Sequence, residues 1–325
     1  MESVERIRVL HVAGWAYSGT TLLANVAGRT SGTFAAGETR LVWERGFLQD
    51  SLCGCGSRFS TCPVWTAVVE RAFGGPAGID AERMAVFATR LLRNRRAPWF
   101  LAGRPSGLFL RKEFGEYAAA VTALYEALRA VTDCRVIVDT SKPPLYNVFL
   151  AALPAVDLWT VQLVRDPRGY LHSLRSRGYG PRPTLALALW TLNHAVAEVA
   201  GRTRRPERHV VLRYEDFARF PVSVARALSD LTDGSSSPKL VKTRRMVLPG
   251  NHMVAGNPSR LTSGIVEITL DEQWRDALPR RTRALAIGMT WPLLIRHGYL
   301  GHKWKSEDAL EGLLGFANHS RQREL

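Results

Sequence analysis

The chain has 325 residues, of which 46% are hydrophobic, and a formal net charge of +15. This length suits one large domain or two ordinary ones, and the hydrophobic content excludes a disordered chain. No apolar run approaches the roughly 20 residues that a membrane-spanning helix needs. The acidic residues Glu2 and Glu5 do not fit a secretory signal. We therefore expect a cytoplasmic protein without a transmembrane segment.

The basic surplus, 44 lysines and arginines against 29 acidic residues, consists mostly of arginine. Such a surplus is typical of proteins that bind nucleic acid, an acidic membrane surface or an anionic small ligand. Here the arginines are scattered along the chain, and no nucleic-acid-binding motif accompanies them. We expect a small polyanionic ligand and no nucleic acid.

Strand-like runs alternate with helical patterns along the chain. This alternation predicts a single α/β domain over residues 1–325, with a central parallel sheet flanked by helices in three layers. We expect a helical cap insertion over about 63–132 and a loop-rich segment over about 234–270. The expected strands are 6–13, 33–36, 135–139, 158–164 and 209–213. The expected helices are 20–29, 63–73, 80–96, 113–131, one from 143, 167–175 and 271–296.

The segment 9–23 (VLHVAGWAYSGTTLL) combines a buried strand, a turn bounded by glycines and a helix that opens on two hydroxyl residues. This arrangement directs backbone N–H groups and the positive end of a helix at a bound anion. Gly14 and Gly19 have the spacing of a nucleoside-triphosphate P-loop, but Thr20 stands where that motif requires lysine. A P-loop small-molecule kinase, which would need that lysine and Mg²⁺, is therefore an alternative to another anion site. A turn without a ligand is a further alternative.

Three cysteines, Cys53, Cys55 and Cys62, form a C-x-C-x6-C pattern in a loop that contains glycine and serine. A structural zinc site needs four ligands, and no convincing fourth ligand lies near this pattern. We therefore expect a loop of reduced thiols and no metal, with a zinc site and a disulfide as alternatives. Cys134, which precedes a strand, is expected to be a buried thiol.

The segment 164–177 (VRDPRGYLHSLRSR) follows a predicted strand and opens a predicted helix. Arg165 and Ser173 lie eight residues apart, and Arg177 lies one turn beyond Ser173, on the same helix face. An arginine fork pairs bidentately with phosphate oxygens. The alternative is a surface helix with a capping Asp-Pro start. Ligands of open parallel sheets bind at the carboxyl ends of the strands, where this segment and the glycine loop both fall.

Together the two segments resemble the nucleotide site of sulfotransferases that use 3′-phosphoadenosine 5′-phosphosulfate (PAPS). The first resembles their 5′-phosphosulfate loop, and the second resembles the segment whose arginine and serine bind the 3′-phosphate. The resemblance implies a P-loop-like core and PAPS as co-substrate. It also implies cofactor-binding roles for Tyr17, Ser18, Gly19, Thr20, Thr21, Arg165, Ser173 and Arg177.

Two later segments extend the resemblance. The segment 213–217 (RYEDF) matches a strand-end Tyr-Glu pair, in which Tyr214 would contact the nucleotide and Glu215 would hold an arginine or backbone groups. The segment 252–260 (HMVAGNPSR) resembles a glycine-containing loop that closes over the adenosine 3′-phosphate. This second likeness implies cofactor-binding roles for Gly256, Asn257 and Arg260.

The catalytic assignment also comes from the resemblance. Glu38 follows glycine as the general base does in tyrosylprotein and some bacterial sugar sulfotransferases, with His252 as a competing base. Glu38 could instead cap a helix or pair with Arg40. Lys142, at the end of the strand 135–139, could reach the bridging oxygen of the phosphosulfate, where negative charge grows.

One position departs from the resemblance. Relatives place Lys or Arg immediately before Ser-Gly-Thr, where this chain has Tyr17. Either Lys142 supplies that charge, or Tyr17 donates a weaker hydrogen bond, or the protein binds a nucleotide without turnover. We predict a sulfotransferase that moves a sulfuryl group by in-line displacement to a hydroxyl or amine of a small-molecule, carbohydrate or natural-product acceptor. The alternatives are the kinase and a non-catalytic nucleotide-binding protein.

Overall fold

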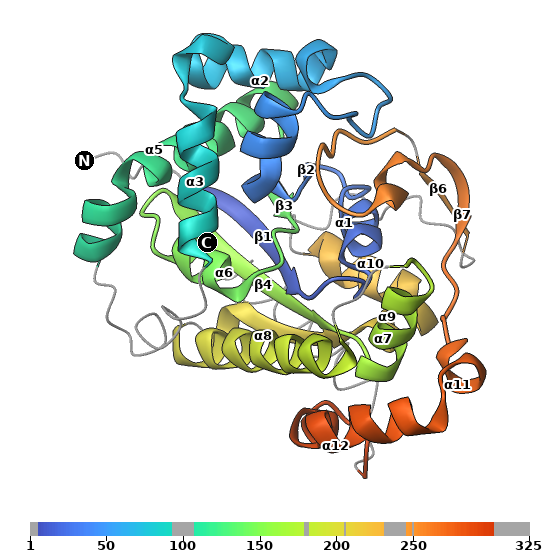
Figure 1. Cartoon of the computed structure of the whole chain (residues 1–325). Coiled ribbons are helices and arrows are strands. Elements are labelled where there is room, and N and C mark those ends of the chain that lie inside the picture. The colour runs from blue at the N-terminus through green and yellow to red at the C-terminus, as the bar shows by residue number, and fades with distance from the viewer. Residues whose placement is uncertain are drawn as a thin grey trace.

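A computed structural model of the chain describes residues 6–92, 107–178, 182–204, 206–230, 245–248 and 250–301. Its centre is a five-stranded sheet in which every neighbouring pair of strands is parallel (Figure 1). The order across the sheet is β2-β3-β1-β4-β5. The strands are β1 Ile7–Gly14, β2 Thr33–Gly37, β3 Val136–Asp139, β4 Val156–Val164 and β5 His209–Arg213.

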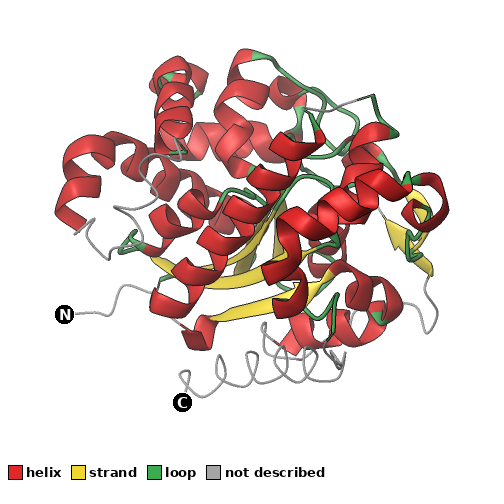
Figure 2. Ribbon diagram, turned by 60° about the horizontal axis from the view of Figure 1, so that its bottom comes forward, coloured by secondary structure: helices red, strands yellow, loops and turns green. Residues whose placement is uncertain are grey.

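Helices cover both faces of the sheet (Figure 2). Because both faces are covered, the central strands are almost continuously buried, as is usual for parallel sheets. In chain order the helices are α1 Thr20–Ala27, α2 Pro63–Phe73, α3 Ala81–Leu91, α5 Gly107–Thr132, α6 Pro144–Ala151, α7 Pro167–Arg175, α8 Pro183–Arg204, α9 Tyr214–Arg219, α10 Pro221–Asp230, α11 Trp274–Ala277 and α12 Arg280–Arg296.

Alternate residues of β1 face two different cores, as the two-residue period of a strand requires. Val9 packs in the core with Leu128 of α5 and Phe149 of α6. Val12 packs in the core with Leu23 of α1 and, from α10, Leu228. The three-layer α/β class predicted from the sequence is therefore confirmed.

The segment between β2 and β3 carries α2, α3 and α5, which lie together at one end of the molecule in Figure 1. Pro63 starts α2, where its fixed φ and missing N–H are tolerated. Trp43 and Tyr117 of α5 are fully buried in this part of the molecule, with ring centroids 6.2 Å apart. The last turns of α5 also pack on the sheet, since Leu128 belongs to the core of β1. Part of the predicted cap insertion thus forms one layer of the main fold.

Several boundaries differ from the prediction. The expected helix 271–296 divides into α11 and α12, because Pro279 precedes α12 with an extended backbone. The expected helix 80–96 ends at Leu91, and its residues 93–96 lie outside the described residues. α8 and a small antiparallel hairpin, β6 Arg245–Leu248 with β7 Gly264–Glu267, are absent from the prediction. No helix in the described part of the chain is long and apolar enough to cross a membrane.

Candidate functional site

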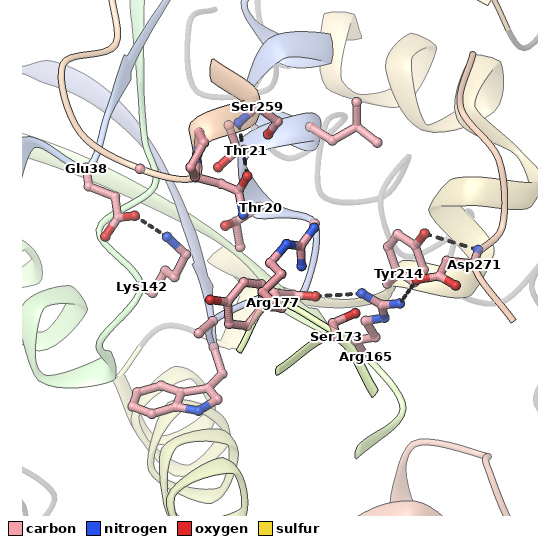
Figure 3. A pocket seen from close by; sticks show the side chains of 18 of the residues that line it. Thr20, Thr21, Glu38, Lys142, Arg165, Ser173, Arg177, Tyr214, Ser259 and Asp271 are labelled. Atoms are coloured by element: carbon pink, nitrogen blue, oxygen red, sulfur yellow. Dashed lines mark hydrogen bonds and ion pairs between the residues drawn. The ribbon is translucent and has the colours of Figure 1, made fainter. Parts of the chain in front are cut away.

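A cavity of about 590 Å³ lies at the carboxyl end of the parallel sheet (Figure 3). Each of the five strands is followed, within three residues of its end, by a residue that lines this cavity. These residues are Trp15 after β1, Glu38 after β2, Lys142 after β3, Arg165 after β4 and Tyr214 after β5. The cavity therefore occupies the place where open parallel sheets bind their ligands.

The loop from β1 to α1 forms one wall of the cavity. A Cβ on Gly14 would lie 2.9 Å from the carbonyl oxygen of Leu163, so only glycine permits this close approach of β1 and β4. Gly19 has a φ of 88° and is the N-cap of α1, which leaves the first N–H groups of that helix without intrahelical partners. Thr20 and Thr21 line the cavity at this positive helix end. Ser18 is fully buried and is not among the lining residues.

Arg165 is held on three sides at the end of β4. Its guanidinium donates hydrogen bonds to the carbonyl oxygen of Tyr17 at 2.9 Å and to Asp271 Oδ2 at 2.7 Å. It also lies over the ring of Tyr214, 4.5 Å from the ring centroid. These contacts fix an almost buried cation on the cavity wall.

Helix α7 carries Ser173, and the turn that follows it carries Arg177, which the prediction places one turn further along the same helix. Asp166 caps α7 by accepting a hydrogen bond from the backbone N–H of Arg168 at 2.8 Å, and Pro167 occupies the first helical position. Ser173, seven residues after Asp166, reaches the cavity from this helix. Arg177 follows, and its guanidinium lies 4.9 Å from the centroid of the Tyr17 ring. The aromatic residue in the loop thus faces a cation from the turn after α7.

Glu38 and Lys142, the two predicted catalytic residues, form an ion pair across the cavity wall. Both side chains are mostly buried, with exposed fractions of 9% and 15%. Arg40 Nη2 lies 3.9 Å from the other oxygen of the Glu38 carboxylate. The Glu38 carboxylate therefore lies between two cations, and the predicted alternative, a pair with Arg40, is present as well.

A buried polar network fixes the backbone that carries Lys142. Asp139 is fully buried, and its carboxylate accepts hydrogen bonds from the Tyr125 hydroxyl at 2.5 Å and from the backbone N–H of Ser141 at 2.6 Å. The Ser141 hydroxyl in turn accepts a bond from the backbone N–H of Arg40 at 3.1 Å. A buried carboxylate requires such hydrogen-bond partners. Through these bonds the network joins the ends of β2 and β3.

Tyr214 and Glu215 point in different directions at the start of α9. The Tyr214 ring lines the cavity beneath Arg165, and burial raises the pKa of its hydroxyl. Glu215 is partly buried and accepts hydrogen bonds from the backbone N–H of Asp166 at 3.1 Å and from the Tyr299 hydroxyl at 2.6 Å. Burial raises the pKa of the Glu215 carboxyl. Glu215 thus holds a backbone group in place, which is one of the roles expected from the sequence.

The C-terminal loop closes the cavity beside α1. Gly256, Asn257 and Ser259 line it, and the Asn257 side chain accepts a bond from the backbone N–H of Ser259 at 3.0 Å. Arg260 is turned toward another loop, where its guanidinium donates to the carbonyl oxygen of Leu52 at 3.1 Å, and it does not line the cavity. His252, the competing base, also lies outside the lining residues, against three cysteines.

Two charged lining residues, Arg40 and Asp271, are absent from the predicted ligand set. The position of Arg40 two residues after Glu38 is a local signal for the first, whereas no nearby motif marks Asp271. The charged lining residues comprise four bases and two acids, so the cavity carries a positive surplus. These residues are Arg40, Lys142, Arg165, Arg177, Glu38 and Asp271.

Comparison with known proteins finds similarity to sulfotransferases. No family model matches the chain. Carbohydrate sulfotransferase 5 of the mouse is 28% identical over an alignment of 161 residues, and the match covers 42% of this chain and 41% of the mouse protein. The chain therefore matches less than half the length of this curated relative.

Two solved structures also align with most of the chain. A sulfotransferase domain from the curacin biosynthetic pathway is 18% identical, with a TM-score of 0.48 over 89% of this chain and 98% of that domain. A sulfotransferase domain from the olefin synthase of Synechococcus PCC 7002 is 18% identical, with a TM-score of 0.46 over 90% and 96%. By name, all three proteins are sulfotransferases, the family that the strand-end motifs of this chain resemble.

Proposed function

We propose that this protein is a PAPS-dependent sulfotransferase. One observation carries the proposal: a single positively charged cavity collects the N-terminus of α1, the pair Arg165 and Ser173, and the ion pair of Glu38 with Lys142. These groups come from separate strand ends, and each has a place in the binding of a phosphosulfate nucleotide or in the transfer of its sulfuryl group.

The cavity offers two anion-binding positions for the nucleotide. Arg165 and Ser173 would bind the 3′-phosphate, since a fixed guanidinium and a hydroxyl can both donate to phosphate oxygens. The N-terminus of α1, with Thr20 and Thr21, would bind the phosphosulfate end. Arg177, whose guanidinium lies 4.9 Å from the centroid of the Tyr17 ring, is seen between these positions in Figure 3 and would add a further cation.

The transfer itself needs a base and a cation. The acceptor oxygen or nitrogen would form a bond to sulfur while the bond from sulfur to the bridging oxygen breaks. Glu38 would take the acceptor proton, a role for which a positioned carboxylate typically contributes ~10²–10⁴-fold. Lys142 would stabilise the charge that grows on the leaving oxygen. The products are the sulfated acceptor and adenosine 3′,5′-bisphosphate.

A preference for a nucleotide with a 3′-phosphate would distinguish a PAPS-dependent sulfotransferase from a kinase. Each hydrogen bond to a charged group contributes ~1.5–3 kcal/mol, so we expect Arg165→Ala to weaken binding of adenosine 3′,5′-bisphosphate roughly tenfold to a hundredfold. Adenosine 5′-phosphate should bind weakly to both proteins. Titration calorimetry of the two nucleotides, and of ATP, measures this preference.

Arg168→Ala is the matched control. Arg168 lies in the same segment, 164–177, as Arg165. It pairs with Asp166 at 2.6 Å and lies over the Trp274 ring, but it does not line the cavity. Its loss should leave nucleotide affinity unchanged. Equal affinities of the wild-type chain for the two adenosine nucleotides would overturn the 3′-phosphate assignment. Transfer of labelled sulfate from PAPS to a panel of hydroxyl and amine acceptors then tests turnover.

A further inference from the structure

Outside the cavity, four side chains with metal-binding atoms meet at one point. Their ligand atoms all lie within 4.8 Å of one another. Three come from the loop before α2, and the fourth comes from the C-terminal segment, 190 residues further along the chain. We call this group the Cys3His cluster: Cys53, Cys55, Cys62 and His252.

The distances in the cluster fit a tetrahedral metal centre. Cys55 Sγ and Cys62 Sγ lie 3.7 Å apart, and His252 Nδ1 lies 3.3 Å from Cys62 Sγ and 3.9 Å from Cys53 Sγ. Zinc bonds of about 2.3 Å to sulfur and about 2.0–2.1 Å to nitrogen place tetrahedral ligands about 3.8 Å apart for two sulfurs and about 3.6 Å for sulfur and nitrogen. These three distances are thus close to those between zinc ligands, and the other pairs of ligand atoms lie within 4.8 Å.

The backbone around the cluster is shaped for close approach. The N–H of Gly56 donates to the carbonyl oxygen of Cys53 at 2.9 Å, which closes a tight turn that contains the first two cysteines, and Gly56 has a φ of 90°. A Cβ on Gly54 would collide with Asn251, the neighbour of His252. The two loops can therefore approach so closely only because glycine stands between the cysteines.

The surroundings also hold the ligands in place. Cys53 and Cys62 are fully buried, and Cys62 immediately precedes the first turn of α2. Trp65 Nε1 donates to the carbonyl oxygen of His252 at 2.6 Å, and the His252 ring stacks on Phe34 with a centroid distance of 6.3 Å. A ligand set that is anchored by its neighbours is what a structural metal site requires.

We propose that the Cys3His cluster binds a structural Zn²⁺ ion. Three soft sulfur ligands and one imidazole favour zinc over magnesium or calcium, which prefer oxygen. The cluster supplies all four ligands of a closed tetrahedral shell, so the ion has no open position for catalysis. Binding would release the three thiol protons to solvent as the thiolates coordinate the metal.

The ion would clamp the loop that closes the cavity. His252 lies four residues before Gly256, and the intervening Ala255 accepts a hydrogen bond from the backbone N–H of Glu38 at 3.5 Å. Arg260 ties the far end of the same loop to Leu52 beside Cys53. Zinc would thus position one wall of the cavity without contacting a substrate. The inference does not rest on the proposed sulfotransferase activity.

Metal analysis of the purified full chain tests the proposal. We expect one zinc per chain, and we expect Co²⁺ in its place to show thiolate charge-transfer bands and the visible spectrum of a tetrahedral site. Cys62→Ser and His252→Ala should each reduce bound zinc to at most about a tenth of an equivalent at equal chelator concentration. His252→Cys should retain the metal, because it keeps four ligands.

Cys134→Ser is the matched control, since Cys134 is also buried but lies outside the cluster. It should keep its zinc. Where Cys62→Ser fails to fold, the Co²⁺ spectrum of the wild-type chain and the metal content of His252→Cys decide. A wild-type chain with neither zinc nor a tetrahedral Co²⁺ spectrum, or a disulfide between Cys55 and Cys62 in the native protein, would refute the site.

Discussion

At the scale of single residues, the pairing of Glu38 with Lys142 joins the two groups on which turnover would depend. The two side chains form an ion pair, and both line the cavity. An acceptor and a nucleotide entering the cavity would meet a carboxylate and an ammonium side by side. The two roles can be separated by substitution, since one acts on the acceptor proton and the other on the leaving oxygen.

Replacing Glu38 by glutamine keeps the shape of the side chain and removes the proton acceptor. We expect the turnover number to fall by about 10²-fold or more, with nucleotide affinity nearly unchanged. Steady-state kinetics and calorimetry measure the two effects. Glu44→Gln, a change at a half-exposed carboxylate outside the cavity, serves as the control. Undiminished turnover of Glu38→Gln would exclude Glu38 as the base.

Lys142→Ala tests the cation. If Lys142 meets charge that grows mainly in the transition state, its loss should lower the turnover number by about 10²–10³-fold and weaken PAPS binding much less. Lys142→Arg should retain part of the activity, and Lys112→Ala, on the exposed side of α5, should be silent. A silent Lys142→Ala would remove Lys142 from the mechanism. In that case Tyr17→Arg should raise activity sharply, because the charge would be missing.

At the scale of elements, α8 and α12 pack through an interface that contains buried histidines. The rings of His194 and His297 lie 6.5 Å apart, and His297 Nε2 lies 3.9 Å from the carboxylate of Glu198. Burial lowers the pKa of His194 to about 3 and that of His297 to about 4. Both histidines are therefore neutral in the folded protein at neutral pH.

This interface makes the fold sensitive to acid. Above the unfolded pKa of about 6.5 the histidines are neutral in both states, so they cause no pH dependence there. As the pH falls from about 6.5 toward 4, the unfolded chain takes up protons that the folded chain does not. Each such histidine then lowers the free energy of unfolding by at most about 1.4 kcal/mol per pH unit.

We therefore expect His194→Gln to flatten the loss of stability between pH 6.5 and 4, even if it lowers stability at neutral pH. Urea unfolding at several pH values measures the slope. His172→Gln, at a half-buried histidine of α7 outside this interface, should leave the slope unchanged. An identical slope for His194→Gln and the wild-type chain would contradict the prediction.

At the scale of the whole molecule, the sheet order explains why the motifs converge. β1 lies at the centre between β3 and β4, so the loop after β1 is flanked by Lys142 on one side and Arg165 on the other. β2 and β5 form the edges and bring Glu38 and Tyr214 to the same end of the sheet. Part of the basic surplus of the chain therefore lines this cavity, where arginine and lysine outnumber the acidic residues. Such a surplus suits a polyanionic ligand.

Much of the fold could be predicted because its signals are local. β5 occupies its predicted residues, and α7 begins at the predicted Pro167, since strand patterns and helix starts depend on neighbours a few residues away. α8 escaped prediction because apolar residues also stand on its exposed side, as Leu185, Leu192 and Val199 do, so one helical face does not stand out in the sequence.

The α/β class, the strand ends that carry polar side chains and the glycine turn before α1 could all be predicted from the amino-acid sequence. Each of these follows from short-range periodicity or from the backbone freedom of single residues. Which distant side chains meet could be seen only in the folded chain. Lys142 binds Glu38 across 104 positions, Asp271 binds Arg165 across 106, and His252 contacts Cys62 across 190. No local pattern encodes such pairs, because they arise only when the strands are ordered in the sheet and the loops are packed around it.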